Sequence, residues 1–260
     1  MRFVGVIPAR WQSTRFPGKM LAPIAGKPLI QWVVEGTRRS RLLDEVIVAT
    51  DEKRIFDFIH DCFGEAAPGK QLRPVSAVMT RPDHPSGTDR VAEAVRSVRC
   101  DIVVNIQGDE PLVRAAIIDQ LARALARDRA AVMATLAREA AAEDLGNPNV
   151  VKLIVNRQGR AIYFSRHAIP YLRDAASEPM GERLKRFRFL KHPGMYAYRR
   201  DFLLKLVKLP PSPLELAERL EQLRVIENGY AIKVVETAHD SIGVDTPEDV
   251  ARVEAVLRKL

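Results

Sequence analysis

The sequence is poor in cysteine and in long apolar runs, and both shortages narrow what the protein can be. Its 260 residues include two cysteines, Cys62 and Cys100, which offer neither a metal-binding spacing nor a disulfide framework. No apolar run reaches membrane-spanning length, and residues 1–8 lack the basic start and long apolar core of a signal peptide. We therefore expect a protein of the reducing cytoplasm without a membrane span.

The usual phosphate-binding and nucleic-acid-binding signatures are missing as well. Lys19 and Lys27 each follow a glycine, but neither precedes Ser or Thr, and the upstream glycine of a P-loop is absent. No RNA-binding aromatic motif or helix-turn-helix pattern is evident. The net charge is nevertheless +8, with the densest basic run at residues 183–188. This charge fits an anionic small substrate and leaves nucleic acid open as an alternative partner.

What the sequence does contain is an alternation of short apolar runs with helical patterns. Residues 3–8, 45–50, 75–79 and 101–106 read as strands, and helices are expected from Leu29, at 53–62 and from about Val91. This order predicts an α/β fold with a Rossmann-like, mostly parallel sheet flanked by helices. Residues 150–155 and 159–166 read as a hairpin within a smaller inserted β-rich subdomain. We expect a core of residues 1–150, a subdomain of 151–212 and a return to the core at 213–260, which holds one helix from residue 213 to Asn228-Gly229.

A basic loop follows the first strand. It carries Arg10, Ser13, Arg15 and Lys19. Ligands of open parallel sheets bind beyond the carboxyl ends of the strands, where this loop would lie. Three cations on one loop suit a polyphosphate, because each phosphate oxygen prefers a charge-assisted donor. A solvated basic turn is the alternative.

Two carboxylates separated by more than a hundred residues are the candidate metal ligands. Asp109 follows a strand in the run Q-G-D-E-P, on the sheet edge that would hold the basic loop. Asp245 precedes Thr246, which reads as the cap of the last helix, so its carboxylate is not needed for capping. Mg²⁺ between them and a triphosphate would explain both acids, since Mg²⁺ takes one or two carboxylates plus phosphate oxygens. The alternatives are a helix cap at Asp109 and a turn-forming Asp245. The metal hypothesis requires both carboxylates to converge beside the basic loop.

Two further polar segments allow both structural and ligand-binding interpretations. Ser86 and Thr88 stand before a helix in a loop with two prolines and can cap that helix. His84 in the same loop reads as structural. The pair at residues 50–51 reads as the cap of the next helix.

Motifs spread over nearly the whole chain resemble those of the CMP-Kdo synthetases (3-deoxy-manno-octulosonate cytidylyltransferases). They are, in order, P-A-R-x-x-S-T-R-x-P-G-K, Q-G-D-E-P, N-P-N-x-V-K, Y-F-S-R, H-x-G-x-Y-x-Y-R, P-S-P-L-E with L-E-Q-L-R, and G-V-D-T-P-E-D. The resemblance implies a fold of the nucleotide-diphospho-sugar transferase type. It also implies the reaction of CTP with the acid sugar Kdo to give CMP-Kdo and pyrophosphate for lipopolysaccharide biosynthesis, with Mg²⁺ as cofactor and a homodimer as the assembly.

The resemblance also implies a role for each matching residue. Residues 1–150 would bind the nucleotide, and 151–212 would bind the sugar and dimerise. The implied nucleotide-binding residues are Arg10, Ser13, Arg15, Lys19, Arg81, Ser86, Thr88 and Gln107. The implied sugar-binding residues are Gln107, Arg166, His192, Tyr196, Glu221 and Gln222. Arg10, Lys19, Asp109 and Asp245 would be catalytic, with Asp109 and Asp245 as the metal ligands.

Several of these residues have another interpretation from the sequence alone. Arg166 could form an ion pair with Asp174 or Glu178, and His192 could be a packed strand residue beside a core Tyr198. Glu221 and Gln222 could lie on an exposed helix face with local ion pairs. An enlarged loop at 63–74 and a charged segment at 171–188, expected to be mobile or a lid, depart from the family pattern. They leave open a cytidylyltransferase for another acid sugar, 8-amino-Kdo or sialic-type.

Overall fold

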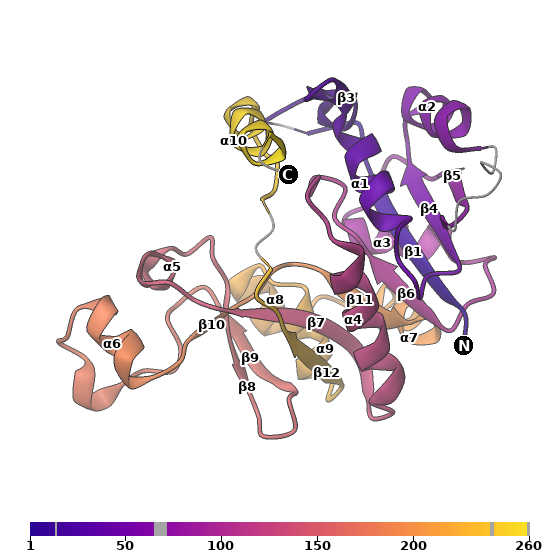
Figure 1. Ribbon diagram of the computed structural model, residues 1–260. Coiled ribbons are helices and arrows are strands. Elements are labelled where there is room, and N and C mark those ends of the chain that lie inside the picture. Colours follow the sequence, from indigo (N-terminus) through magenta and orange to yellow (C-terminus); the bar gives the residue numbers. More distant parts are fainter. Residues whose placement is uncertain (14, 65–71, 240–241, 259–260) are drawn as a thin grey trace.

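A ten-stranded mixed sheet crosses the molecule (Figure 1). The computed structural model describes residues 1–13, 15–64, 72–239 and 242–258, so Thr14 and most of the predicted enlarged loop lie outside the described residues. Nine strands follow one path, namely β5 (Val75–Met79), β4 (Glu45–Thr50), β1 (Phe3–Ala9), β6 (Ile102–Asn105), β11 (Tyr196–Arg199), β7 (Ala131–Glu139), β10 (Leu190–Lys191), β8 (Lys152–Val155) and β9 (Ala161–Ser165). The tenth, β12 (Ala231–Glu236), pairs with β7.

Most strands of this sheet run in one direction. β5, β4, β1 and β6 pair in parallel. β11 lies antiparallel between β6 and β7, so β7 runs the same way as β6, and β12 pairs with β7 in parallel. Of the strands in this sheet, only β11, β10 and β9 run the opposite way. The predicted mostly parallel α/β sheet is confirmed.

Helices cover both faces of the sheet because strand residues alternate between two apolar clusters. In β4, Val46 and Val48 belong to one cluster, and Ile47 and Ala49 belong to the other. The first cluster packs under α1 (Leu29–Thr37), α2 (Lys53–Phe63) and α4 (Ala115–Arg127). The second packs under α3 (Gly87–Ala94), α7 (Arg200–Leu206) and α9 (Gln222–Glu227).

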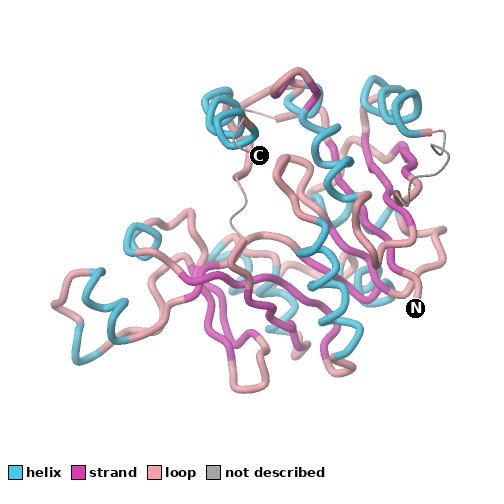
Figure 2. The backbone as a smooth tube through the Cα atoms, in the orientation of Figure 1, coloured by secondary structure: helices cyan, strands magenta, loops and turns pink. Residues whose placement is uncertain are grey.

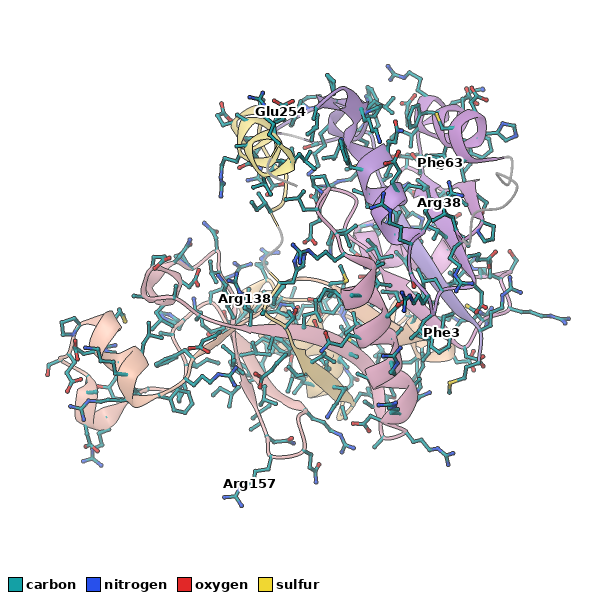
Figure 3. The ribbon with its side chains drawn as sticks, in the orientation of Figure 1. Phe3, Arg38, Phe63, Arg138, Arg157 and Glu254 are labelled. Carbon is teal, nitrogen blue, oxygen red and sulfur yellow. The ribbon has the colours of Figure 1, made fainter. Side chains whose placement is uncertain are left out.

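The hairpin of β8 and β9, with β10, extends one end of the sheet. α5 (Ala142–Gly146) and α6 (Met180–Arg186) lie at this end, and α6 projects away from the helices around β1 (Figures 1 and 2). Figure 3 places Arg157 at the tip of the hairpin, far from Glu254 on α10 (Pro247–Leu257). Residues 151–212 also supply β11, which lies inside the main sheet. The exact domain boundaries stay a prediction. A separate two-stranded hairpin, β2 (Pro23–Ile24) and β3 (Lys27–Pro28), holds α10 through the backbone N–H of Ala25 and the carboxylate of Glu254, 2.8 Å apart.

Two predicted helices differ in their boundaries. α3 begins at Gly87 rather than near Val91, because Ser86 caps it by accepting a hydrogen bond from the Asp89 backbone N–H (3.2 Å). The helix expected after residue 212 is two helices, α8 (Pro213–Glu218) and α9. The break falls at Arg219, whose φ of +54° is left-handed and ends α8.

The basic run at residues 183–188 is tied to other parts of its own chain. Arg186 pairs with Glu178, Lys185 pairs with Glu182, and Arg188 pairs with Glu139 and Glu236. The Arg183 guanidinium donates to the backbone carbonyl of Glu178 (2.9 Å). The longer charged segment 171–188 contains α6 and a 3₁₀ turn at Arg173–Ala175. The cations of the 183–188 run named here are held by carboxylates and a carbonyl and do not form a free basic stripe. Among the described helices, none combines the length and the apolar content that crossing a membrane requires.

Candidate active site

The basic loop after β1 folds back on itself at Gly18. The Gly18 N–H donates to the Trp11 carbonyl (3.3 Å), and its φ of +69° is left-handed. A Cβ on Gly18 would lie 2.9 Å from the Trp11 ring, so both the conformation and the space require glycine. This turn brings the chain back to Lys19, which begins a short 3₁₀ helix, Lys19–Leu21. The loop conformation therefore places Lys19 at the carboxyl end of β1.

The Q-G-D-E-P loop after β6 packs against the same strand end. A Cβ on Gly108 would lie 2.7 Å from the Pro8 carbonyl oxygen and 3.3 Å from the Met20 sulfur. Only glycine lets the two backbones approach this closely. The contact fixes Asp109 beside Lys19.

The Lys19 ammonium joins three segments that are far apart in the sequence. Nζ lies 2.7 Å from Asp109 Oδ2, 3.0 Å from the Val244 carbonyl and 3.3 Å from Asp245 Oδ1. Arg15 also pairs with Asp245 (3.0 Å), and the Val244 N–H donates to the Asp109 carbonyl (2.9 Å). The two aspartates therefore converge at the basic loop, as the metal hypothesis requires.

A cavity of about 390 Å³ opens over this junction. Eight of the residues proposed for the site line it, namely Arg10, Ser13, Arg15, Lys19, Ser86, Gln107, Asp109 and Asp245. The other lining residues are Pro8, Met20, His84, Pro85, Gly87, Arg90 and Gly108. Cations and carboxylates thus face one space of ligand size.

Two predicted nucleotide-binding residues lie outside this cavity lining. Arg81 is exposed, with its guanidinium 3.8 Å from the Asp83 carboxylate. Thr88 is buried and donates a hydrogen bond to Glu221 Oε1 (2.6 Å). A nucleotide contact for either stays a prediction.

The sequence analysis missed a clamp that shapes the cavity wall. The buried Arg90 guanidinium on α3 lies 3.2 Å from Asp51 Oδ2 and also contacts the Thr80 hydroxyl. Asp51 Oδ1 accepts from the Trp11 N–H (3.1 Å), so one carboxylate joins α3 to the basic loop. The prediction that residues 50–51 cap α2 is wrong, because Glu52 is its N-cap. In the sequence, the polar pair Thr50-Asp51 at the end of a strand was the feature that could have indicated this contact.

A second anchor on α3 holds the loop that precedes it. Glu93 Oε2 accepts from the Arg81 N–H (3.1 Å) and from His84 Nε2. Burial opposes ionisation of Glu93, but these hydrogen bonds hold its pKa below the usual range. His84 therefore has a structural role, as expected from the sequence, while also lining the cavity.

The predicted sugar-binding residues His192, Tyr196 and Gln222 lie together near the start of β11. The Tyr196 hydroxyl donates to Gln222 Oε1 (3.2 Å), and the rings of His192 and Tyr196 are 5.3 Å apart. Gln107 reaches them from the cavity by donating to the Gly194 carbonyl (2.7 Å). Gln222 is 4% exposed, so the exposed-face interpretation is wrong for it. Tyr198 is a fully buried core residue, as expected.

Burial sets the protonation of this group. It lowers the pKa of His192 to about 3 and, together with the charge of Glu221, raises the pKa of Tyr196 well above its usual value. Burial also raises the pKa of Glu221, although hydrogen bonds from Thr88 and Ser86 act in the other direction. A neutral imidazole and a neutral phenol therefore stand beside a carboxylate that ionises less readily than usual.

Comparison with known proteins decides the family. A cytidylyltransferase family model matches residues 4–234. The 3-deoxy-manno-octulosonate cytidylyltransferase of Geobacter sulfurreducens is 49% identical over 263 residues, covering 100% of both chains. The chain belongs to the 3-deoxy-manno-octulosonate cytidylyltransferase family. The protein of the same name from Bdellovibrio bacteriovorus is also 49% identical, over 99% of this chain and 98% of its own.

A solved structure of the family superposes on the whole chain. It is a CMP:2-keto-3-deoxy-manno-octonic acid synthetase complexed with CTP, with a TM-score of 0.88 and 41% identity. It covers 100% of this chain, and 99% of that structure is matched. The cytidylyltransferase fold is therefore shared from end to end.

One predicted sugar ligand of the cytidylyltransferase, Arg166, makes other contacts here. Its guanidinium donates to the carbonyls of Glu218 (2.7 Å) and Pro148 (2.9 Å), so it holds the end of α8. Glu178 pairs with Arg186 instead of Arg166. A sugar contact by Arg166 stays a prediction.

The residues around Lys19 fit Mg²⁺. Asp109 and Asp245 offer hard carboxylate oxygens that approach one cation, the Lys19 ammonium. Within the described ranges no cluster of three or more His, Cys, Asp or Glu forms a complete protein cage. Mg²⁺ does not require one, because phosphate oxygens and water complete its shell.

Proposed function

We propose that this chain transfers CMP from CTP to the anomeric hydroxyl of Kdo, releasing pyrophosphate, in lipopolysaccharide biosynthesis. The observation that carries the proposal is the convergence of Lys19, Asp109 and Asp245 at one cavity. The names of relatives at 49% identity supply the acceptor and the cytidylyl transfer, and the solved structure at 41% identity is complexed with CTP.

The cations of the basic loop would bind the triphosphate. Arg10, Arg15 and Lys19 line the cavity and would hold the β- and γ-phosphates and the departing pyrophosphate. Lys19 now neutralises two carboxylates, and Arg15 pairs with one of them. Both cations would thus lie where the negative charge of the triphosphate arrives. Ser13, Ser86 and Gln107 are the polar lining residues that would contact the rest of the nucleotide.

Asp109 and Asp245 would hold Mg²⁺. When bound, this ion neutralises phosphate charge and lowers the pKa of the attacking hydroxyl. The protein's own contribution is to hold both carboxylates at the cavity through Lys19 and through the backbone bond between Val244 and Asp109.

The acid sugar would bind between Gln107 and a set of polar residues at the start of β11, His192, Tyr196 and Gln222, called here the polar group near β11. Its contacts would come from Gln107, Arg166, His192, Tyr196, Glu221 and Gln222. Gln107 links the two regions, because it lines the cavity and donates to the Gly194 carbonyl. The anomeric hydroxyl would attack the α-phosphorus in line. Such a transfer depends on positioning and charge stabilisation, so no dedicated general base is invoked.

We also propose a homodimer formed by residues 151–212, acting in the cytoplasm. This segment exposes three large apolar side chains, Ile162, Tyr171 and Phe187, which a partner subunit could cover. Cys62 and Cys100 are free thiols, which fits a reducing compartment. Sedimentation of the purified protein should give twice the mass of the chain, and a monomer at micromolar concentration would contradict the dimer.

A pyrophosphate-release screen tests the function. Nucleoside triphosphates are combined with Kdo, 8-amino-Kdo and a sialic acid in the presence of Mg²⁺, and CTP with Kdo should give the fastest release. A faster reaction with another acid sugar would reassign the acceptor.

Asp109→Asn tests the metal role within the same assay. We expect turnover to fall at least ~100-fold because one charged ligand is lost. Asp128→Asn is the control, since Asp128 pairs with Arg160 away from the cavity and its replacement should leave turnover within about twofold. Full activity of folded Asp109→Asn with Mg²⁺ present would refute the metal role.

A further inference from the structure

Thr135 contacts His192 from inside the sheet. It lies on β7, is fully buried and pairs across the ladder with Tyr196 of β11. Its Oγ1 is 2.8 Å from the Met195 carbonyl oxygen and 2.8 Å from His192 Nε2. One hydroxyl therefore makes two hydrogen bonds, although it has a single proton to donate.

The proton count of this hydroxyl determines where the imidazole proton lies. A carbonyl oxygen can only accept, so the Thr135 proton must point at Met195. Oγ1 must then accept from His192, and Nε2 must carry a proton. In a neutral imidazole this leaves Nδ1 as a bare acceptor.

The surroundings keep the ring neutral and fixed. The Phe164 ring and the imidazole pack edge-to-face with centroids 5.0 Å apart, and the centroid of the tilted Tyr196 ring is 5.3 Å from that of the imidazole. The backbone N–H of His192 donates to the Val151 carbonyl (2.9 Å), which fixes the main chain at this residue. Burial among these groups holds the pKa of His192 near 3, so the neutral form persists across the physiological range.

Two polar atoms of the group near β11 are left for a ligand. His192 Nδ1 has no hydrogen-bond partner among the described residues. Gln222 Nε2 is a buried donor that also has none there, because the Gln222 amide oxygen takes the Tyr196 hydroxyl. An acceptor and a donor on two neighbours of one tyrosine suit a sugar hydroxyl, which both donates and accepts.

We propose that Thr135 is a positioning residue that fixes His192 as the Nε2-protonated neutral tautomer, so that Nδ1 accepts a hydrogen bond from a hydroxyl of the acid sugar. The proposal rests on the proposed function for the identity of the ligand, but the tautomer itself does not. It adds a specificity element, since an acceptor nitrogen favours a sugar that carries a donor at this point.

Nuclear magnetic resonance tests the tautomer without any turnover. In ¹⁵N-histidine-labelled protein, long-range ¹H–¹⁵N correlations distinguish the two neutral tautomers, and His192→Gln assigns the signal among the five histidines. We expect a neutral Nε2–H imidazole that does not titrate between pH 5.5 and 8. A proton on Nδ1, or titration near pH 6.5, would overturn the proposal.

Kinetics test what the tautomer does for substrate binding. Thr135→Val removes the hydroxyl at similar volume, whereas Thr135→Ser keeps it. We expect Thr135→Val to raise the KM for the acid sugar about tenfold and to leave the KM for CTP within about twofold, with Thr135→Ser close to wild type. An unchanged sugar KM in folded Thr135→Val would overturn the proposal.

The two tests separate this proposal from the proposed function. If Thr135→Val does not fold, the wild-type spectrum remains decisive, because it reports the tautomer without any change at residue 135. If the wild-type protein turns over no acid sugar, the proposed function fails, while the spectrum still reports the tautomer.

Discussion

Lys19 shows how one side chain can define a site. Its ammonium is nearly buried and contacts two carboxylates and a carbonyl, so it makes as many hydrogen bonds as it has protons. The sequence named this residue and both aspartates as candidates, while a solvated basic turn, a helix cap at Asp109 and a turn-forming Asp245 stayed open as alternatives. It did not single out Thr135 or Arg90, whose roles arise only from buried partners on other elements.

Replacement of Lys19 tests its place in the nucleotide site. In Lys19→Met we expect CTP affinity to fall about 10- to 100-fold, equivalent to roughly 1.4–2.7 kcal/mol, because a phosphate partner is lost and two carboxylates repel the triphosphate. Calorimetry measures the affinity. Lys27→Met is the control, since Lys27 pairs with Glu35 outside the nucleotide cavity. Unchanged affinity in Lys19→Met would remove this residue from the site.

At the scale of elements, the candidate active site depends on loops that lie in contact at the carboxyl ends of β1 and β6. Strand runs were predictable because apolar residues mark them. The break between α8 and α9 was not, because a left-handed arginine decides it locally. The start of α3 was placed too late, although Ser86 had been named as a possible cap of that helix. The close approach of Gly108 to Pro8 was not predictable either, because it depends on how two loops pack in the tertiary structure.

Gly108→Ala tests that close approach. The new methyl group would meet a backbone oxygen, which cannot move aside as a side chain could. We expect a loss of about 1–3 kcal/mol in the free energy of unfolding, measured in urea, and slower turnover as Asp109 shifts. Gly181→Ala is the matched control, because it lies in α6 with nothing within 4 Å of the added methyl. The control should be neutral or slightly stabilising, and equal effects from both changes would contradict the argument.

For the whole molecule, the carboxylate of Glu221, which precedes Gln222 of the polar group near β11, makes the free energy of unfolding depend on pH. Burial raises the pKa of Glu221, with Arg224 lowering it and Asp89 raising it, so the folded state binds the Glu221 proton more tightly than the unfolded state does. The free energy of unfolding therefore falls as pH rises from the unfolded pKa of Glu221 through its folded pKa. At pH values above the folded pKa, Glu221 is ionised in both states, and the full free-energy cost of burying its charge remains.

Glu221→Gln should remove this cost. Its amide oxygen can still accept from Thr88, whose hydroxyl is 2.6 Å from Glu221. We expect the variant to gain thermal stability relative to wild type, and the gain to be larger at pH 8 than at pH 5. Melting curves of both proteins at the two pH values measure it. Glu182→Gln, which removes an exposed partner of Lys185, should show no such difference. An equal gain at both pH values would mean that ionisation of Glu221 has no energetic cost.

The position of β11 also limits how the chain can be divided. This strand comes from the segment that was expected to form a separate subdomain, yet it is hydrogen-bonded to both β6 and β7. A fragment ending near residue 150 would lack β11, so the backbone edges of β6 and β7 that pair with this strand would have no partner. Under the proposed function, shuffling that segment with a relative would therefore exchange a central strand together with the residues proposed to hold the acid sugar. Recombination of acceptor preference would then have to respect the register of that strand.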